Sequence, residues 1–190
     1  MARQKGRNVI LGVTGSIAAY KAPSILRGLQ DRGHTVQVVM TPAAQQLVGP
    51  STFRSLSGRP VVTDIFVEDG QADLEHIALA DWADVLAVAP ATANFIGKAA
   101  NGIADEALSL TWMACDCPKL IAPALNDRMW RSEPVQRNCA YLRGLPGVHF
   151  VGPVEGKLAS GRTGVGHLAP IEEIVEAIHS LAMHPDRKKT

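Results

Sequence analysis

The chain has 190 residues and a mass of 20.2 kDa, which corresponds to about one domain at roughly 100–200 residues per domain. With 19 Lys and Arg against 18 Asp and Glu, the formal charge is +1, and 46% of the residues are apolar, so the composition is that of a compact protein rather than of a disordered chain or a polyanion binder. No apolar run approaches the ~20 residues of a membrane span. We therefore expect one cytoplasmic domain over residues 1–190, with a flexible tail at about 184–190 and neither nucleic-acid nor membrane partners.

The three cysteines predict neither a disulfide framework nor a metal site. Cys115, Cys117 and Cys139 are an odd number in a chain long enough to fold without cross-links, so we expect reduced thiols. One residue separates Cys115 from Cys117, and no second Cys or His pair has zinc-ligand spacing. We expect no metal.

The first 40 residues predict a strand, a helix and a second strand. Residues 8–13 form an apolar run that ends at Thr14-Gly15-Ser16, and helical spacing then continues from Ile17 to a stop at residues 31–33. A second apolar run at residues 35–40 follows within two residues. Such a rapid return implies a parallel neighbouring strand and a right-handed crossover.

The same alternation continues along the chain. The pattern predicts strands at 84–89, 119–122 and 148–151, mostly helical structure over 92–114 with interruptions at Gly97 and Asn101-Gly102, and helices at 129–142 and 171–183. Strands that alternate with helices predict an α/β fold, a three-layer, doubly wound, mostly parallel sheet of the Rossmann or flavodoxin type.

Two segments interrupt the alternation. Residues 50–73 contain Gly58, Pro60 and Gly70, and we expect a surface excursion that leads to the helix holding His76. Residues 152–170 are rich in glycine and have no periodicity. A long loop of this kind is typical of a lid or a binding loop, so this segment is a functional candidate.

Polar residues follow the predicted strands, at the sheet edge where ligands bind in this fold class. They lie in four places: Gly15-Ser16, Thr41, residues 90–94 and residues 123–126. Gly15-Ser16 joins a strand to a helix start, where free N–H groups and a hydroxyl suit a phosphate. The full dinucleotide glycine pattern is missing, and Met40-Thr41 stand where a ribose-binding acid would be expected. A mononucleotide phosphate is therefore favoured over NAD.

Several segments together resemble the homo-oligomeric flavin-containing cysteine decarboxylases over nearly the whole chain. They are Gly12–Lys21, His76-Ile77, Pro90–Phe95, Asn101–Asp105, Pro123–Trp130 and Gly156–Gly166. The resemblance implies FMN as cofactor, decarboxylation of a cysteine-derived carboxylate, and a homo-oligomer, a trimer or a dodecamer. In such an oligomer a neighbouring subunit completes the flavin edge.

The resemblance also implies roles for individual residues. The FMN-binding residues are Gly15, Ser16, Ile17, Thr41, Thr92, Ala93, Asn94 and Ser109. The catalytic residues are His76 as base, Asn126 as the group that holds the substrate carboxylate, and Ser160 in the flap over residues 156–166. The substrate-binding residues are Asn126, Met129, Ala159, Ser160 and Gly161. His167 lies at the exit of the flap, where it could touch a ligand.

From the residues alone, two of these assignments have simpler interpretations. A histidine on a helix flank, such as His76, is more often a surface residue, although its place before a buried strand favours a functional role. Asn126 after Pro123 would serve well as a helix N-cap. Both interpretations stay open at this stage.

The expected chemistry accounts for the residue types. A cysteine-derived carboxylate cannot lose carbon dioxide without an electron sink, and bound FMN supplies one by two-electron oxidation of the thiol-bearing carbon. A neutral imidazole with a pKa near 6.5 suits removal of the thiol proton at neutral pH. The protein supplies orientation, a dry pocket and a carboxylate clamp.

The chain departs from the coenzyme A branch of this family at two positions. Leu125 stands where a Met is typical, which is a mild change. Ser160 stands where a flap cysteine protonates the ene-thiolate, and a hydroxyl is a much weaker acid than a thiol of pKa ~8.5.

Three functions therefore remain open. Overall similarity favours decarboxylation of phosphopantothenoylcysteine in coenzyme A biosynthesis. Ser160 favours oxidative decarboxylation of a peptide C-terminal cysteine to an ene-thiol, as in lanthipeptide synthesis. The third is an FMN-binding regulatory protein of the Hal3 type, against which the retained His76 and Asn126 count.

Overall fold

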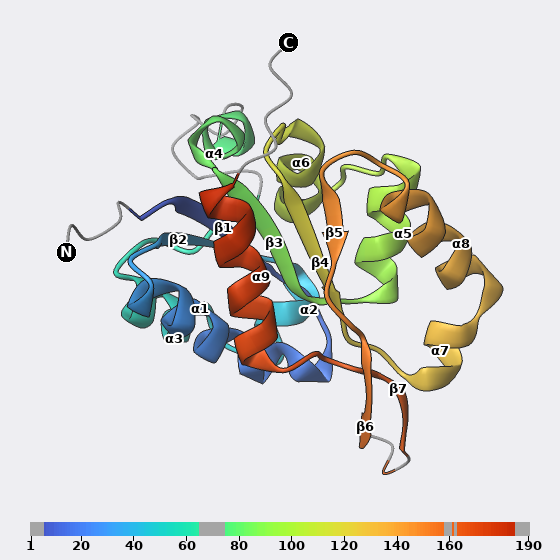
Figure 1. The fold of residues 1–190 in the computed structure, drawn as a ribbon. Coiled ribbons are helices and arrows are strands. Elements are labelled where there is room, and N and C mark those ends of the chain that lie inside the picture. Colours follow the sequence, from blue (N-terminus) through green and yellow to red (C-terminus); the bar gives the residue numbers. More distant parts are fainter. Residues whose placement is uncertain (1–5, 65–74, 158–160, 162, 185–190) are drawn as a thin grey trace.

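A parallel sheet forms the centre of the computed structural model, which describes residues 6–64, 75–157, 161 and 163–184 (Figure 1). The strand order is β2-β1-β3-β4-β5, and every neighbouring pair is parallel. The bounds are β1 Asn8–Val13, β2 Thr35–Met40, β3 Val85–Ala91, β4 Lys119–Pro123 and β5 Val148–Phe150. The predicted doubly wound fold is confirmed, and the direction of winding reverses between β1 and β3, where such sheets bind ligands.

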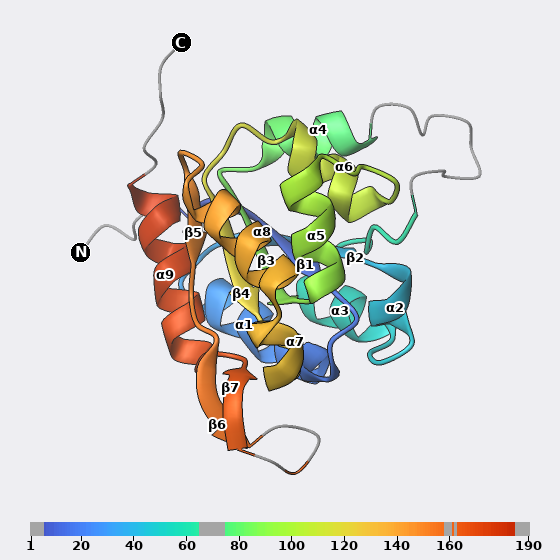
Figure 2. The ribbon, with the colours of Figure 1, turned by 90° about the vertical axis from the view of Figure 1, so that its right-hand side faces the viewer.

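Helices cover both faces of the sheet, which gives three layers (Figures 1 and 2). The helices that pack on one face are η1 Ile17–Lys21, α1 Ala22–Asp31, α2 Pro42–Gln45, α3 Pro50–Ser57 and α9 Ile171–Met183. The helices that pack on the other face are α4 Glu75–Trp82, α5 Ala93–Asn101, α6 Ala107–Ala114 and α8 Glu133–Arg143. The short helix α7 Asp127–Arg131 precedes α8 at the carboxyl edge of the sheet.

The interiors of the central strands are apolar because each of their faces meets a layer of helices. In β1, Val9 and Leu11 pack toward α1 and α9, whereas Ile10 packs toward α5 and α6. All seven residues of β3 are buried. This two-sided burial explains why the sequence of these strands reads as continuous apolar runs.

The prediction of a surface excursion at residues 50–73 is wrong for its first part, where the structure has helix α3. Pro50 occupies the first turn, where its missing N–H costs nothing, and Gly58 ends the helix in the left-handed region at φ 69°. Phe53 is fully buried against α1. The residues that suggested a loop therefore delimit a helix, and residues 65–73 of the predicted segment lie outside the described residues.

The prediction of a structureless stretch at residues 152–170 is also wrong, because this segment contains an antiparallel pair of strands. β6 Val154–Lys157 pairs with β7 Thr163–His167, and Figure 1 shows the two strands projecting from the body of the sheet. Gly156 lies opposite Gly164 in this pair. Without side chains at these positions the alternation that identifies a strand is absent from the sequence.

Two predicted helices have different boundaries in the structure. Gly97 lies inside α5, and the helix ends instead at Gly102, which has φ 69°. The predicted helix at 129–142 is two helices, because Ser132 is extended and serves as the N-cap of α8, whose first turn contains a proline. β5 is followed by β6 and β7, so the strand predicted as the last is not the last.

A histidine pair joins α9 to the start of β2. His34 is 4% exposed, and its Nδ1 accepts a hydrogen bond from the Arg7 N–H at 3.2 Å. The neutral ring therefore carries its proton on Nε2, which donates to His179 Nδ1 at 2.9 Å. Burial lowers the pKa of His34, and the charge of His179 lowers it further.

The histidine pair makes folding stability depend on pH. Because the pKa of His34 is lowered on folding, the unfolded state binds the proton more readily, and stability falls as the pH drops below the usual histidine pKa of about 6.5. We expect the urea concentration at the unfolding midpoint to be lower at about pH 5.5 than at about pH 7.5. This difference should be smaller in His34→Leu than in the parent. The exposed His184→Gln serves as the control. A His34→Leu variant with the parent's pH dependence would contradict this role.

Among the helices of the described residues, none has the length and apolar character needed to cross a bilayer.

Candidate active site

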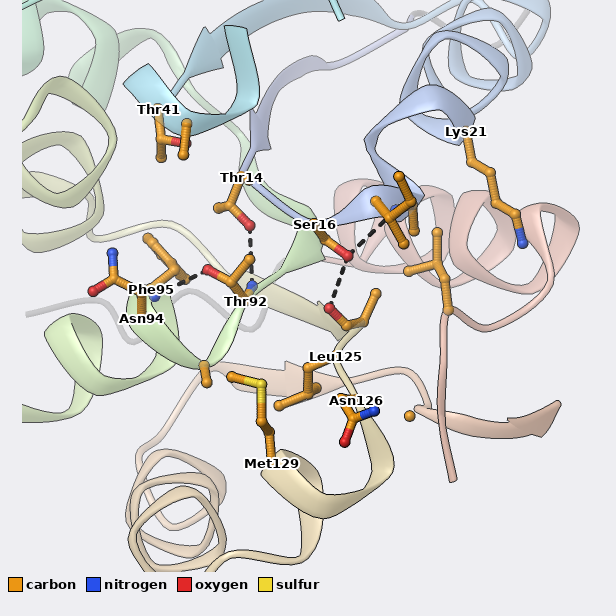
Figure 3. Close-up of a pocket in the computed structure, with 18 of the residues that line it drawn as sticks. Thr14, Ser16, Lys21, Thr41, Thr92, Asn94, Phe95, Leu125, Asn126 and Met129 are labelled. Carbon is orange, nitrogen blue, oxygen red and sulfur yellow. Dashed lines mark hydrogen bonds between the residues drawn. The ribbon is translucent and has the colours of Figure 1, made fainter. Parts of the chain in front are cut away.

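Four N-cap residues meet at the carboxyl edge of the sheet. Ser16, Thr41, Thr92 and Asn126 follow β1, β2, β3 and β4, and each accepts a hydrogen bond from a backbone N–H at the start of the next helix. Figure 3 shows them around one pocket. The parallel topology brings them together, since strand ends from distant parts of the sequence lie side by side.

These residues line a cavity of about 950 Å³. Ten of the predicted site residues contribute to its lining: Gly15, Ser16, Ile17, Thr41, Thr92, Ala93, Asn94, Asn126, Met129 and Gly161. The volume is at the upper end of the roughly 300–1,000 Å³ that is usual for small-molecule sites. The cavity can therefore hold a ligand of nucleotide size together with part of a second molecule.

Thr14 holds two of the strand ends in place, a role that sequence reasoning missed. Its Oγ1 donates to the Pro90 carbonyl at 2.8 Å and accepts from the Thr92 N–H at 3.0 Å. Thr14 is 1% exposed and links the loop after β1 to the loop after β3. The sequence signal was its place in the turn Thr14-Gly15-Ser16.

Ser16 fixes the turn after β1. Its Oγ donates to the Ala124 carbonyl at 2.9 Å and accepts from the Ala18 N–H at 3.3 Å. A Cβ added at Gly15 would lie 2.4 Å from the Ala43 Cβ, so the turn passes α2 too closely for any other residue. The Ala19 N–H donates to the Ser16 carbonyl at 2.8 Å, so Ser16 holds the first turn of η1 through both its side chain and its backbone.

Asn126 combines the two roles that the sequence left open. Its Oδ1 accepts from the Arg128 N–H at 2.9 Å, which makes it the N-cap of α7, and the residue also lines the cavity beside Met129. Since the oxygen is used by the cap, the Nδ2 group is the part that can donate to a ligand. A carboxylate is a suitable acceptor for this donor.

The β6–β7 hairpin forms one wall of the cavity. The Leu125 N–H donates to the Gly166 carbonyl at 3.0 Å, and a Cβ at Gly166 would lie 2.2 Å from the Leu125 carbonyl oxygen. Lys21 Nζ, at the end of η1, lies 3.0 Å from His167 Nε2 on β7. The hairpin is therefore held by two contacts, one to Leu125 after β4 and one to Lys21 in η1.

Glu106 is the one acidic residue among the described residues that line the cavity. Burial raises the pKa of its carboxyl, although Lys98 Nζ lies 3.6 Å from its Oε1. Lys98 is closer to Asp105, at 2.7 Å, and this contact lowers the pKa of Asp105. The charge of the Glu106 carboxyl is thus partly neutralised, and no sequence motif predicted that this residue lines the cavity.

Ser109 lies next to Asp105 and Glu106, but it does not line the cavity. Its Oγ accepts from the N–H groups of Asp105 and Glu106, both at 3.1 Å, as part of the capping box of α6. Ser109 is fully buried. The structure therefore gives it a capping role, and any effect on a cofactor would be indirect.

His76 lies on α4, away from the cavity lining of its own chain. It borders a small separate space with Val62, Leu79 and Thr111, and its Nδ1 is buried without a hydrogen-bond partner among the described residues. Helix α4 precedes β3, so it lies near the amino end of the sheet. His76 therefore does not join the other predicted catalytic residues at the cavity of its own chain.

Two predicted substrate-binding residues, Ala159 and Ser160, lie outside the described residues. Within the part of the chain that is described, no group of three or more His, Cys, Asp or Glu side chains is arranged to hold a metal ion, and Cys115, Cys117 and Cys139 are free thiols.

Comparison with known proteins identifies the family. A model of the family described as "Flavoprotein" matches residues 2–183. The chain belongs to the flavoprotein family. The recognition of a flavin-containing family from the sequence motifs is confirmed.

Individual flavoproteins resemble the chain over most of its length. It is 47% identical over 170 residues to the coenzyme A biosynthesis bifunctional protein CoaBC of Bacillus subtilis (strain 168), and the match covers 90% of this chain. The chain spans only 42% of the length of that relative.

Two solved structures match nearly the whole fold. The FMN-dependent cysteine decarboxylase SpaF has a TM-score of 0.81 and 36% identity, covering 96% of this chain and 100% of SpaF. A cysteine-to-serine mutant of a PPC decarboxylase, complexed with pantothenoylaminoethenethiol, has a TM-score of 0.83 and 28% identity, covering 95% and 100% of the two chains.

Proposed function

We propose that this flavoprotein binds FMN and decarboxylates a cysteine-derived carboxylate, phosphopantothenoylcysteine of coenzyme A biosynthesis. The observation that carries the proposal is the 950 Å³ cavity at the carboxyl edge of the sheet, where the predicted cofactor and substrate residues meet. Its similarity to CoaBC and to FMN-dependent cysteine decarboxylases supports the proposal.

The residues of the cavity fit an FMN molecule. The turn at Gly15-Ser16 lines the cavity where β1 meets the start of η1, which is the place where this fold class binds a phosphate. Thr41 and Thr92 place hydroxyl groups on the same cavity, and Ile17 and Met129 supply apolar contact. Bound FMN provides the two-electron redox chemistry, while this chain's residues bind, orient and exclude water.

A Ser16→Asp variant is expected to purify as apoprotein. The carboxylate would face the FMN phosphate with like charge and could no longer donate to the Ala124 carbonyl. Ser16→Asn is the matched control, because Asn has the size of Asp but no charge, and it should retain more FMN than Ser16→Asp. Flavin absorbance per chain, measured beside the thermal midpoint of each variant, decides the outcome. Full flavin occupancy in Ser16→Asp would exclude this phosphate site.

Asn126 is proposed to hold the substrate carboxylate through its Nδ2 group. Asp caps a helix as well as Asn, so Asn126→Asp preserves α7 while it replaces an N–H donor with a negative charge. We expect KM to rise by about 10- to 100-fold, as for the loss of a charge-assisted hydrogen bond. Asn126→Ser, a neutral cap, should have an intermediate effect. An unchanged KM in Asn126→Asp would remove Asn126 from the substrate site.

The base His76 is proposed to reach the cavity of a neighbouring chain in a homo-oligomer, a trimer or an assembly of trimers. His76 does not line the cavity of its own chain, and several apolar side chains at the cavity rim are exposed, among them Ile17 at 62% and Met129 at 51%. A homo-oligomer would bury these apolar side chains at its interface. The same interface would bring His76 of one chain to the cavity of another. Sedimentation that gives a fully active monomer would contradict this arrangement.

Mass spectrometry of the products tests the proposed substrate. The protein is incubated separately with phosphopantothenoylcysteine and with a peptide that ends in cysteine. Loss of carbon dioxide from the first substrate supports the coenzyme A reaction. Turnover of the peptide alone would favour the second candidate, oxidative decarboxylation of a peptide cysteine, for which Ser160 in the flap is the specific observation.

A further inference from the structure

The ionisable groups that line the cavity carry an excess of positive charge. Lys21 and Lys157 are basic, and His167 adds a group that can become cationic. Glu106 is the one acid in the described lining, and Lys98 already lies beside it. The lining therefore favours ligands with more than one negative charge.

Lys21 and His167 form a pair whose geometry is fixed from several sides. Lys21 Nζ donates to His167 Nε2 at 3.0 Å, although the two residues lie 146 positions apart in the sequence. Gly156 makes room for the imidazole, because a Cβ there would lie 3.0 Å from the His167 Cγ. The hydrogen bond between Leu125 and Gly166 fixes the adjacent backbone.

The pair suits a phosphate monoester. An ammonium group has three donors, of which His167 uses one, so Lys21 can still donate to a bound anion. A phosphate monoester carries about −1.5 to −2 charges at pH 7, so its oxygens are strong acceptors for the Lys21 ammonium beside His167.

The other expected anions already have partners in the proposed function. The FMN phosphate is assigned to the turn at Ser16, and the substrate carboxylate to Asn126. We propose that Lys21 and His167 bind a phosphate group at the far end of the substrate. This inference rests on the proposed function, and it specifies a phosphorylated small molecule rather than a peptide.

Equilibrium binding tests the inference without requiring turnover. Pantothenate and phosphopantothenate differ only in the phosphate and contain no cysteine to decarboxylate. We expect the FMN-loaded protein to bind phosphopantothenate at least about tenfold more tightly than pantothenate, since hydrogen bonds to charged groups contribute at this level. Lys21→Met and His167→Asn should each remove most of this preference.

Arg128→Met is the matched control. It removes one exposed positive charge near the site that is not part of the lining, and the preference should persist. Equal binding of the two probes by the parent protein would overturn the inference, whatever the outcome of the turnover assays. Phosphate preference with no turnover of either cysteine substrate would instead overturn the proposed function alone.

The FMN phosphate is a second possible occupant of the pair, and the same variants distinguish it. If the substrate phosphate binds here, Lys21→Met leaves the FMN dissociation constant within about threefold of the parent value. A tenfold weaker FMN affinity, with the phosphopantothenate preference intact, would assign the pair to the cofactor and overturn the inference.

Discussion

His76→Asn is expected to purify with FMN and to lose turnover by at least about 100-fold, the usual contribution of a general base. Asparagine retains a polar side chain of similar size but cannot take up the thiol proton near neutral pH. The FMN content should not change, because His76 does not line the cavity of its own chain. Product formation and flavin absorbance are measured on the same preparation.

The exposed His149 provides a control for this experiment. It lies on β5, outside the cavity lining, so His149→Asn should retain the parent rate. If His76→Asn also keeps a near-normal rate, the assignment of His76 as base is wrong, and the residue reverts to a helix-flank histidine without a catalytic role.

Mixed oligomers can reveal which chain supplies the base. His76→Asn has an intact cavity, and Asn126→Asp has an intact His76. If each site combines a cavity from one chain with His76 from another, co-expression of the two variants should restore about one quarter of the parent activity, since random mixing places both intact parts together at that frequency. The assay uses substrate far below the raised KM of Asn126→Asp, so that sites with this substitution contribute little. Separately purified variants that are then mixed without exchange of subunits serve as the control. No restoration in verified mixed oligomers would exclude a base supplied by a neighbouring chain.

The sheet could be predicted from sequence because its strands are marked by burial on both faces. Residues 8–13 and 35–40 have the same bounds in the structure as in the prediction, and both are apolar runs next to clear turns. The secondary-structure predictions were wrong where they depended on residues that occur in more than one kind of local structure. Pro50 and Gly58 occur in loops but also begin and end helices, and the strands of the hairpin contain glycine where an alternating side chain would identify them.

The candidate site was partly predictable because topology alone places the strand ends together. Ser16, Thr41, Thr92 and Asn126 each follow a strand, so a parallel sheet brings them to one edge without further information. The pair of Lys21 with a histidine 146 residues away depends on how the hairpin docks, which no local pattern contains. The proposed access of His76 to a cavity requires a second chain, and the sequence of one chain contains no pattern that specifies such a contact.

Under the proposed function, the identity of residue 160 determines which product we expect. Decarboxylation with return of both electrons to the substrate gives a saturated thiol, and the return requires a proton donor. Decarboxylation without that return gives an ene-thiol that has lost carbon dioxide and two hydrogens, and dioxygen must then reoxidise the flavin. A serine hydroxyl donates a proton far less readily than a thiol with a pKa of about 8.5, so Ser160 favours the ene-thiol.

Ser160→Cys is therefore expected to shift the product of phosphopantothenoylcysteine from the ene-thiol toward the saturated thiol. Mass spectrometry under limited oxygen distinguishes the two products, because the ene-thiol is lighter by two hydrogens and accumulates only as fast as the flavin is reoxidised. Ser160→Ala is the matched control and should behave as the parent does, since neither side chain is an effective acid. If the parent already forms the saturated thiol over many turnovers with little oxygen, another donor such as a water molecule or His167 protonates the ene-thiolate. The serine would then be compatible with the complete coenzyme A reaction, and a thiol at position 160 would leave the product unchanged.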